Sequence, residues 1–215
     1  SFAHAGQGET RIGGYPAACA PSAMPPAQIE RLAREIADGE GVRPDLVVGD
    51  MDSLPLDILE EVKKAGIPFQ RYDTCKDETD TRLALLAALE GGARSIEMIA
   101  ATGDRIDHTL ANIHLLYAAL LRGVDACILT PDSRIFLVDA CSTISGSKGA
   151  LVSLLPLTAV VRGISLSGFR WDIEEASMEI GNPYGISNKL CSDEARIQVR
   201  EGTLVAVIYS PAFQD

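Results

Sequence analysis

Residues 95–130, SIEMIAATGDRIDHTLANIHLLYAALLRGVDACILT, form the stretch that decides the fold. Apolar runs at 95–100 and 125–130 predict two strands, and apolar residues at helical spacing between them predict a helix over 106–121. A strand–helix–strand order predicts neighbouring parallel strands. We expect the buried face of the helix to consist of Ile106, Leu110, Ile113, Tyr117 and Leu120.

The same alternation extends back along the chain to Asp45. Apolar runs predict strands over 45–48 and 67–72, with residues at helical spacing over 56–62 between them. A further helix is expected over 79–89, ending at Gly91-Gly92. Its buried residues are expected to be Leu83, Leu86 and Ala87. We therefore expect residues 1–132 to form an α/β domain with a mainly parallel sheet.

The first 45 residues contribute least to this prediction. Apolar residues at helical spacing after Pro25-Pro26 predict a helix over 28–38. Upstream of it, a segment rich in Gly, Ala and Pro predicts no strand.

The pattern changes after Pro131 to short β-rich runs separated by turn residues. We expect residues 133–215 to form an all-β sandwich, with Gly146-Ser147-Lys148-Gly149 as a hairpin turn. The predicted strands are 134–138, 151–155, 160–166, 178–180, 197–199 and 204–209.

Composition excludes several classes of protein. The chain of 215 residues carries a net charge of −11, so it lacks the positive surface that nucleic-acid binding requires. No apolar stretch is long enough to cross a bilayer, and residues 1–4 show no secretory signal. Its 5 cysteines include no C-x-x-C pair, which predicts reduced thiols in a cytoplasmic protein.

Acidic residues gather where two predicted strands end. Asp50 and Asp52 follow the strand over 45–48, and Asp77 and Asp80 follow the strand over 67–72. Loops at the carboxyl ends of parallel strands face one crevice, where close carboxylates repel each other unless metal ions are bound. Oxygen ligands of this kind suit Mg²⁺. Capping of the following helix is the alternative role for the second pair.

A third loop, Thr102-Gly103-Asp104-Arg105, feeds the helix over 106–121. Backbone N–H groups at a helix start attract anions, and Arg105 adds a bidentate phosphate donor. On the helix, Arg105, His108, Thr109 and Asn112 are spaced to share one polar face. We interpret this face as functional, although an isolated His108 would more often be a surface or packing residue.

Two features of the β-rich part specify no ligand by themselves. Gly185-Ile186-Ser187-Asn188 has the composition of a turn. Trp171, the single tryptophan, is by default a core or interface anchor.

Taken in order, these motifs resemble the thiamine pyrophosphokinase family. The resemblance rests on Val48-Gly49-Asp50-Met51-Asp52-Ser53-Leu54, Asp77-x-x-Asp80, the run from Thr102 to Asn112, and Ser187-Asn188. Three later segments fit the family's C-terminal pattern: Ser153-Leu154-Leu155-Pro156-Leu157, Gly168-Phe169-Arg170-Trp171 and Gly202-Thr203-Leu204-Val205. The chain departs from the family at its start, where no strand, Gly-Gly turn and second strand are found, and at Ala100-Ala101, which replaces a glycine.

The resemblance implies that ATP and thiamine react to give AMP and thiamine diphosphate, with Mg²⁺, in a homodimer with active sites across its interface. It implies a metal and phosphate site at Asp50, Asp52, Asp77 and Asp80. The nucleotide side would include Thr102, Gly103, Arg105, Asp107, His108 and Asn112. Thiamine would contact Ser187 and Asn188, with Trp171 stacking on its pyrimidine ring from the partner subunit. Asp50, Asp52, Asp80 and Arg105 are the expected catalytic residues.

Two alternatives stay open at this point. Asp50-Met51-Asp52-Ser53 also resembles the nucleophile motif of haloacid dehalogenase phosphatases, although the expected helical cap has no counterpart here. A non-catalytic acidic metal-binding module is the second alternative, but it gives no role to Arg105, His108 and Asn112.

Overall fold

The computed structural model describes residues 2–6, 9–13, 45–49, 63–64, 66–71, 78–182 and 184–210. They divide into two compact units, one holding the elements before Pro131 and the other those that follow it. The helix expected over 28–38 and the helical spacing over 56–62 lie outside the described residues; residues 63–64, which follow the second segment, are helical.

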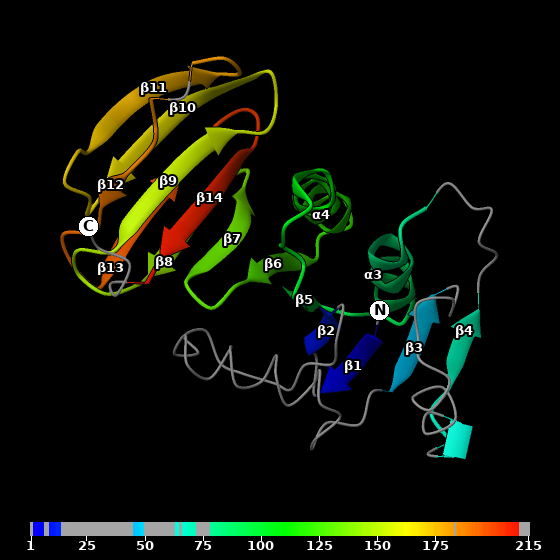
Figure 1. Ribbon diagram of the computed structural model, residues 1–215. Helices are drawn as coiled ribbons and strands as arrows, with labels where there is room; N and C mark the ends of the chain where they lie inside the picture. The colour runs from blue at the N-terminus through cyan, green and yellow to red at the C-terminus, as the bar shows by residue number, and fades with distance from the viewer. Residues whose placement is uncertain are drawn as a thin grey trace. The chain divides into compact units, whose positions relative to one another are not determined.

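The sheet of the first unit mixes parallel and antiparallel strands (Figure 1). Parallel pairing joins β2 to β5, β5 to β6 and β3 to β4, whereas β1 is antiparallel to both β2 and β3. The sequence predicted a mainly parallel sheet and did not predict β1, which is antiparallel to both of its neighbours. The strand order is β6 (Asp125–Leu129), β5 (Ser95–Ile99), β2 (Glu9–Gly13), β1 (Phe2–Gly6), β3 (Leu46–Gly49) and β4 (Phe69–Arg71).

The expectation of no strand near the N-terminus is wrong, because β1 and β2 both lie there. Their sequences, FAHAG and ETRIG, contain few of the β-branched and aromatic residues that favour strands. Backbone pairing over all five residues with β5 holds β2 in place, so the neighbouring strand supplies what local propensity lacks.

Helix α3 (Asp80–Glu90) begins and ends as its sequence predicts. The Thr79 hydroxyl accepts a hydrogen bond from the Arg82 N–H at 3.3 Å, and Gly91 forms the C-cap. The expected buried face is partly wrong, because Leu86 and Ala87 are only half-buried. Since α3 packs against both the sheet and helix α4, its buried face is wider and consists of Leu83, Ala84, Leu85 and Ala88.

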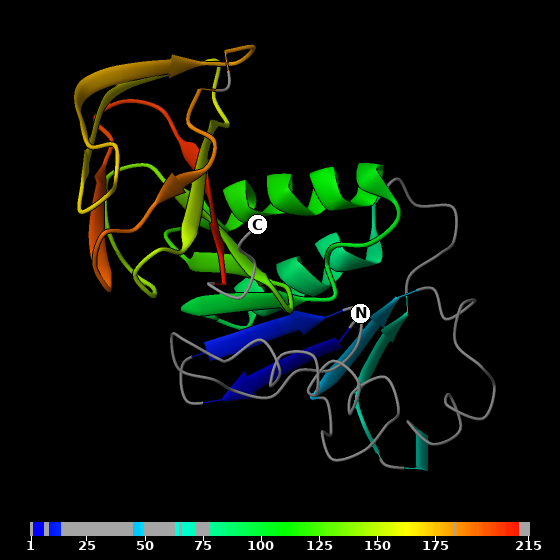
Figure 2. The same ribbon diagram turned by 60° about the vertical axis from the view of Figure 1, so that its left-hand side comes forward.

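Helix α4 (Ile106–Leu120) buries a different face from the expected one. Ile106 is 73% exposed, Leu110 53% and Tyr117 36%. Both described helices lie on the same face of the sheet (Figure 2), and α4 faces β6 and α3 through Asn112, Leu116 and Ala119. Ile106, Leu110 and Tyr117 therefore face solvent, whereas Leu116 is the large apolar side chain that α4 buries. Neither described helix has the length and apolar character needed to cross a membrane.

The second unit consists of two antiparallel sheets (Figure 1). Large buried side chains come from both, among them Leu154 and Leu204 from one and Ile164 and Ile197 from the other. One sheet has the order β7 (Ser133–Val138), β14 (Leu204–Tyr209), β9 (Leu151–Pro156) and β12 (Asn188–Lys189). The other has the order β11 (Ile173–Glu179), β10 (Val160–Ser167), β13 (Glu194–Gln198) and β8 (Cys141–Ser145).

Three features of this unit differ from the sequence prediction. Strands β11 (Ile173–Glu179) and β13 (Glu194–Gln198) begin several residues before the predicted runs at 178–180 and 197–199. Strands β8 and β12 were not expected, because CSTIS is mostly polar and β12 has only two residues. The turn at 146–149 joins β8 to β9, which belong to different sheets, and is therefore not a hairpin turn.

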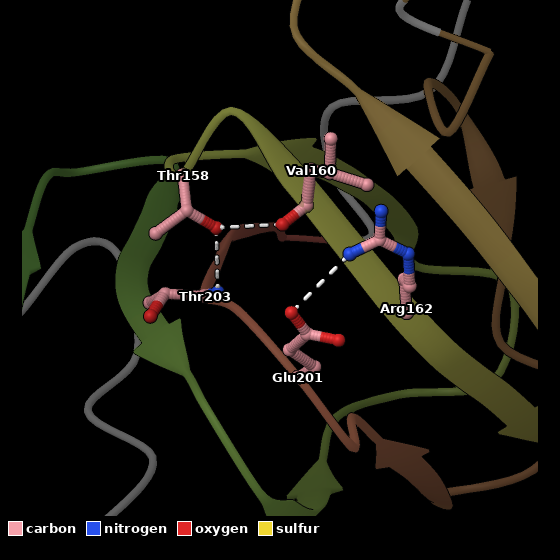
Figure 3. A network of polar contacts seen from close by, with 5 residues as sticks. All are labelled: Thr158, Val160, Arg162, Glu201 and Thr203. Atoms are coloured by element: carbon pink, nitrogen blue, oxygen red, sulfur yellow. Dashed lines mark hydrogen bonds and ion pairs between the residues drawn. The ribbon is translucent and has the colours of Figure 1, made fainter.

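A polar network joins the start of β10 to the loop before β14 (Figure 3). The Thr158 hydroxyl donates to the Val160 carbonyl at 3.1 Å and accepts from the Thr203 N–H at 3.0 Å. Gly202 has φ +88°, and a Cβ there would lie 2.6 Å from the Val160 carbonyl oxygen. Arg162 and Glu201 add an exposed ion pair at 3.2 Å, which contributes little to stability. The network thus links strands of the two sheets.

We expect Thr79→Ala to destabilise the protein by about 1 kcal/mol, because the first turn of α3 loses its cap. The melting temperature should fall by about 2–4 °C in a thermal unfolding experiment. Thr79→Ser keeps the hydroxyl and should melt with the unmodified protein; equal losses in both variants would contradict the capping role.

Candidate functional site

Only one of the four carboxylates expected at the metal site can be placed. Asp50, Asp52 and Asp77 lie outside the described residues. Asp80 is half-buried in the first turn of α3, where the positive end of the helix dipole stabilises its charge. Within the described ranges, no three His, Cys, Asp or Glu side chains lie close enough to hold a metal ion.

The loop between β5 and α4 is held from the helix side by two hydrogen bonds. The buried Asn112 amide nitrogen donates to the Ala101 carbonyl at 2.8 Å, and the Gly103 N–H donates to the Thr109 hydroxyl at 3.3 Å. Asn112 and Thr109 therefore position this loop, which includes Thr102 and Gly103, at the start of α4. A structural use of these two side chains was not part of the sequence prediction.

Arg105 and Asp107 form a bidentate ion pair at the solvent-exposed start of α4. Arg105 Nε and Nη2 lie 3.2 and 2.5 Å from the two carboxylate oxygens of Asp107. These hydrogen bonds raise the pKa of Arg105 and lower the pKa of Asp107 from their ordinary values. Asp107 is ionised in the neutral range, and its lowered pKa extends the ion pair further into acid, until pH falls through that pKa. The guanidinium is thus charged, oriented and open to solvent.

The polar face expected for α4 runs from solvent to the interior. Arg105 is the N-cap residue, His108 in the first turn is exposed, Thr109 is half-buried and Asn112 is buried. Arg105 and His108 can reach a ligand from solvent, whereas Asn112 supports the loop from within.

Ala100 adopts φ +55°, a left-handed conformation that costs an L-residue energy and a glycine almost none. It directly follows β5 and begins the loop that leads to Arg105. In the sequence, Ala100-Ala101 replaces a glycine of the family pattern. The backbone at Ala100 has a conformation that favours glycine.

In the second unit, the structure brings Trp171, Ser187 and Asn188 together. The Asn188 Oδ1 accepts from the Trp171 N–H at 3.2 Å, and the Asn188 Nδ2 donates to the Trp171 carbonyl at 2.8 Å. Ser187 has φ +61°, and its N–H donates to the Ser153 hydroxyl at 3.1 Å. Trp171 and Asn188, both expected to contact thiamine, are thus bonded to each other within one chain, and Ser187 directly precedes Asn188.

The indole of Trp171 forms an exposed aromatic platform. Trp171 is 53% exposed, and the Arg170 guanidinium lies 4.8 Å from the centroid of its ring. Such an arrangement lets a flat ring stack on the indole. Sequence reasoning missed Arg170, Ser153 and Asp172 as supports of this platform, because their contacts arise only through the fold.

Comparison with known proteins links both units to one family. The family profile described as "Thiamin pyrophosphokinase, catalytic domain" matches residues 27–128. The profile described as "Thiamin pyrophosphokinase, vitamin B1 binding domain" matches residues 141–204.

Individual relatives agree with these profiles. A thiamine pyrophosphokinase of Bacillus subtilis (strain 168) is 27% identical over 169 residues, which cover 78% of this chain and 79% of the relative. Thiamine pyrophosphokinase 1 of Oryza sativa subsp. japonica is 26% identical, over 72% of this chain and 62% of the longer plant protein. A crystal structure of thiamin pyrophosphokinase from Geobacillus thermodenitrificans aligns with TM-score 0.75 and 25% identity, over 93% of this chain and 96% of that one.

We expect Ala100→Gly to stabilise the protein by about 0.5–1 kcal/mol, because it relieves the left-handed strain at φ +55°. Urea unfolding measures the change. Ala101→Gly is the matched control: Ala101 is buried and has no positive φ, so this variant should be less stable than the unmodified protein. Destabilisation by both variants would show that Ala100 is not strained.

Proposed function

The chain belongs to the thiamin pyrophosphokinase family, and we propose that it transfers the diphosphate group of ATP to the hydroxyl of thiamine, giving thiamine diphosphate and AMP. The observation that carries this function is the match of a catalytic and a vitamin B1 binding profile, in that order, to the two parts of the chain. We assign ATP to residues 1–132 and thiamine to residues 133–215.

In this reaction the thiamine hydroxyl oxygen forms a bond to the β-phosphorus of ATP. The bond between the β-phosphorus and the oxygen bridging to the α-phosphorus breaks, AMP leaves, and the hydroxyl proton passes to a base. Phosphoryl transfer of this kind has a loose transition state, so positioning and charge neutralisation matter more than a strong base. We assign the role of proton acceptor to one of the four carboxylates of the site, with Asp80 as the candidate.

We propose that Asp50, Asp52, Asp77 and Asp80 hold Mg²⁺ against the ATP phosphates. The carboxylate of Asp80, placed in the first turn of α3, belongs to the oxygen-donor class that Mg²⁺ prefers. When bound, Mg²⁺ would neutralise charge on the phosphate oxygens. Without it, four carboxylates would repel ATP.

The start of α4 is the proposed nucleotide side of the site. The guanidinium of Arg105, oriented by Asp107, can donate two parallel hydrogen bonds to phosphate. Thr102, Gly103 and His108 lie in the same segment and complete the proposed ATP contacts, and Asn112 supports the loop through Ala101. Charge that develops on the phosphate oxygens would then meet a donor that is already oriented.

Thiamine is proposed to bind on the platform of the second unit. As the family resemblance implies, the exposed indole of Trp171 would stack on the pyrimidine ring in the partner subunit's site, while Ser187 and Asn188 would contact the thiamine of their own subunit. Because one ring face of Trp171 already contacts Arg170, a ligand ring would stack on the other face.

We further propose a homodimer with active sites across its interface, located in the cytoplasm. The exposed apolar side chains of α4, Ile106, Leu110 and Tyr117, are the kind of surface that a second subunit covers. Among the described cysteines, Cys141 and Cys191 form no disulfide, the state expected in a reducing compartment.

The alternatives are not favoured. A haloacid dehalogenase phosphatase has no use for a vitamin B1 binding domain, which the family profile matches over residues 141–204. A non-catalytic acidic module would leave the catalytic-domain match over residues 27–128 without a role.

A single assay tests the proposed activity: AMP production from ATP, with and without thiamine and Mg²⁺. We expect AMP only when both are present, in a ratio of one AMP to each thiamine diphosphate formed. Phosphate release from simple monoesters in the absence of thiamine would support the phosphatase instead.

Arg105→Gln should lower kcat/KM for ATP by about 10²-fold, because an oriented charged donor to the transferring phosphates is lost. Arg122→Gln is the matched control, since Arg122 is exposed just beyond the other end of α4. Equal kinetics of the two variants in the AMP assay would remove Arg105 from the site.

A further inference from the structure

From the contacts around the Trp171 platform, we infer that Asn188 is a positioning residue: its side chain holds the backbone of Trp171, and through it the indole, in the orientation that thiamine requires. This inference rests on the proposed function and refines it. The family resemblance assigns Asn188 to thiamine itself, whereas the structure directs its amide to Trp171.

The backbone around Trp171 explains why such a side chain is needed. Residues 168–170 pair with residues 189–191: the Arg170 N–H donates to the Lys189 carbonyl at 2.8 Å, and the Cys191 N–H donates to the Gly168 carbonyl at 2.9 Å. At Trp171 this backbone pairing ends. The amide of Asn188 takes its place, because a carboxamide offers the same donor and acceptor as a peptide group.

Most of the hydrogen-bonding capacity of Asn188 is used in this way. Its Oδ1 accepts from the N–H groups of Trp171 and Lys189, at 3.2 and 2.9 Å, and its Nδ2 donates to the Trp171 carbonyl. The residue is only 9% exposed. A carboxamide can donate two hydrogen bonds and accept two, so only one N–H of Asn188 is left for any other partner. The geometry thus favours support of Trp171 over recognition of a ligand.

The indole depends on this support because few other contacts within the described part of the chain orient it. Trp171 is 53% exposed and outside the apolar core, and its ring contacts the guanidinium of Arg170. A second contact closes the same turn: Asp172 Oδ1 accepts from the Phe169 N–H at 2.9 Å, and Phe169 is buried. The turn at 168–172 is therefore anchored at Phe169 and oriented by Asn188 and Asp172.

The test uses Trp171 as its own reporter, since it is the only tryptophan in the chain. In Asn188→Ala, time-resolved fluorescence anisotropy of the free enzyme should show a larger fast component, because the indole gains local motion. The KM for thiamine should rise by about tenfold, because thiamine must then immobilise an indole that is mobile in the free enzyme. The kcat at saturating thiamine and the KM for ATP should change by less than about twofold.

Two further variants make the result interpretable. Asp172→Ala loosens the same turn from its other side, so it should increase both Trp171 motion and the KM for thiamine, and it decides the question if Asn188→Ala does not fold. Asn182→Ala is the matched control: Asn182 lies in an exposed turn, its side chain makes no hydrogen bond within the described part of the chain, and neither readout should change.

Several outcomes would overturn the inference. A higher KM for thiamine with unchanged anisotropy in Asn188→Ala would make Asn188 a direct ligand. Greater indole motion without a change in KM would show that its orientation does not matter for binding. If the unmodified protein forms no thiamine-dependent AMP, the proposed function fails, and the anisotropy comparison still decides whether Asn188 holds Trp171.

Discussion

Backbone pairing of β2 is the interaction on which the first unit depends. Its five residues pair with β5 on one side and β1 on the other, so they join the β5–β6 pair to the β1–β3–β4 group. Both described helices lie on the sheet assembled in this way (Figure 2). Strand β5, which leads into the proposed nucleotide loop, is therefore held by a strand some ninety residues earlier in the chain.

Side-chain amides perform the same task at both proposed binding regions. Asn112 bonds the Ala101 carbonyl under the nucleotide loop, and Asn188 bonds the Trp171 backbone beside the indole platform. In each place an irregular backbone segment lies beyond the reach of regular strand pairing, and a buried asparagine satisfies its polar groups. The loop that leads to Arg105 and the backbone of Trp171 are held in this way, while Arg105 and Trp171 themselves stay exposed.

Much of the fold follows from local sequence. Apolar runs located β3, β5, β6 and most strands of the second unit, and capping residues located α3, because these signals act over a few neighbouring residues. The buried face of α4 was not predictable in this way. The helix has apolar residues on more than one side, and which side is buried depends on β6 and α3 rather than on the helix.

The sequence by itself determined most elements from β3 onward, the change to strands alone after Pro131 and the residues that resemble a thiamine pyrophosphokinase site, because these signals are properties of the chain. Only the tertiary structure decided that β1 and β2 are strands, that Ala100 is left-handed and that Asn188 meets Trp171. Each of these features depends on groups distant in sequence or on a backbone angle set by its surroundings, and no local pattern encodes such a contact.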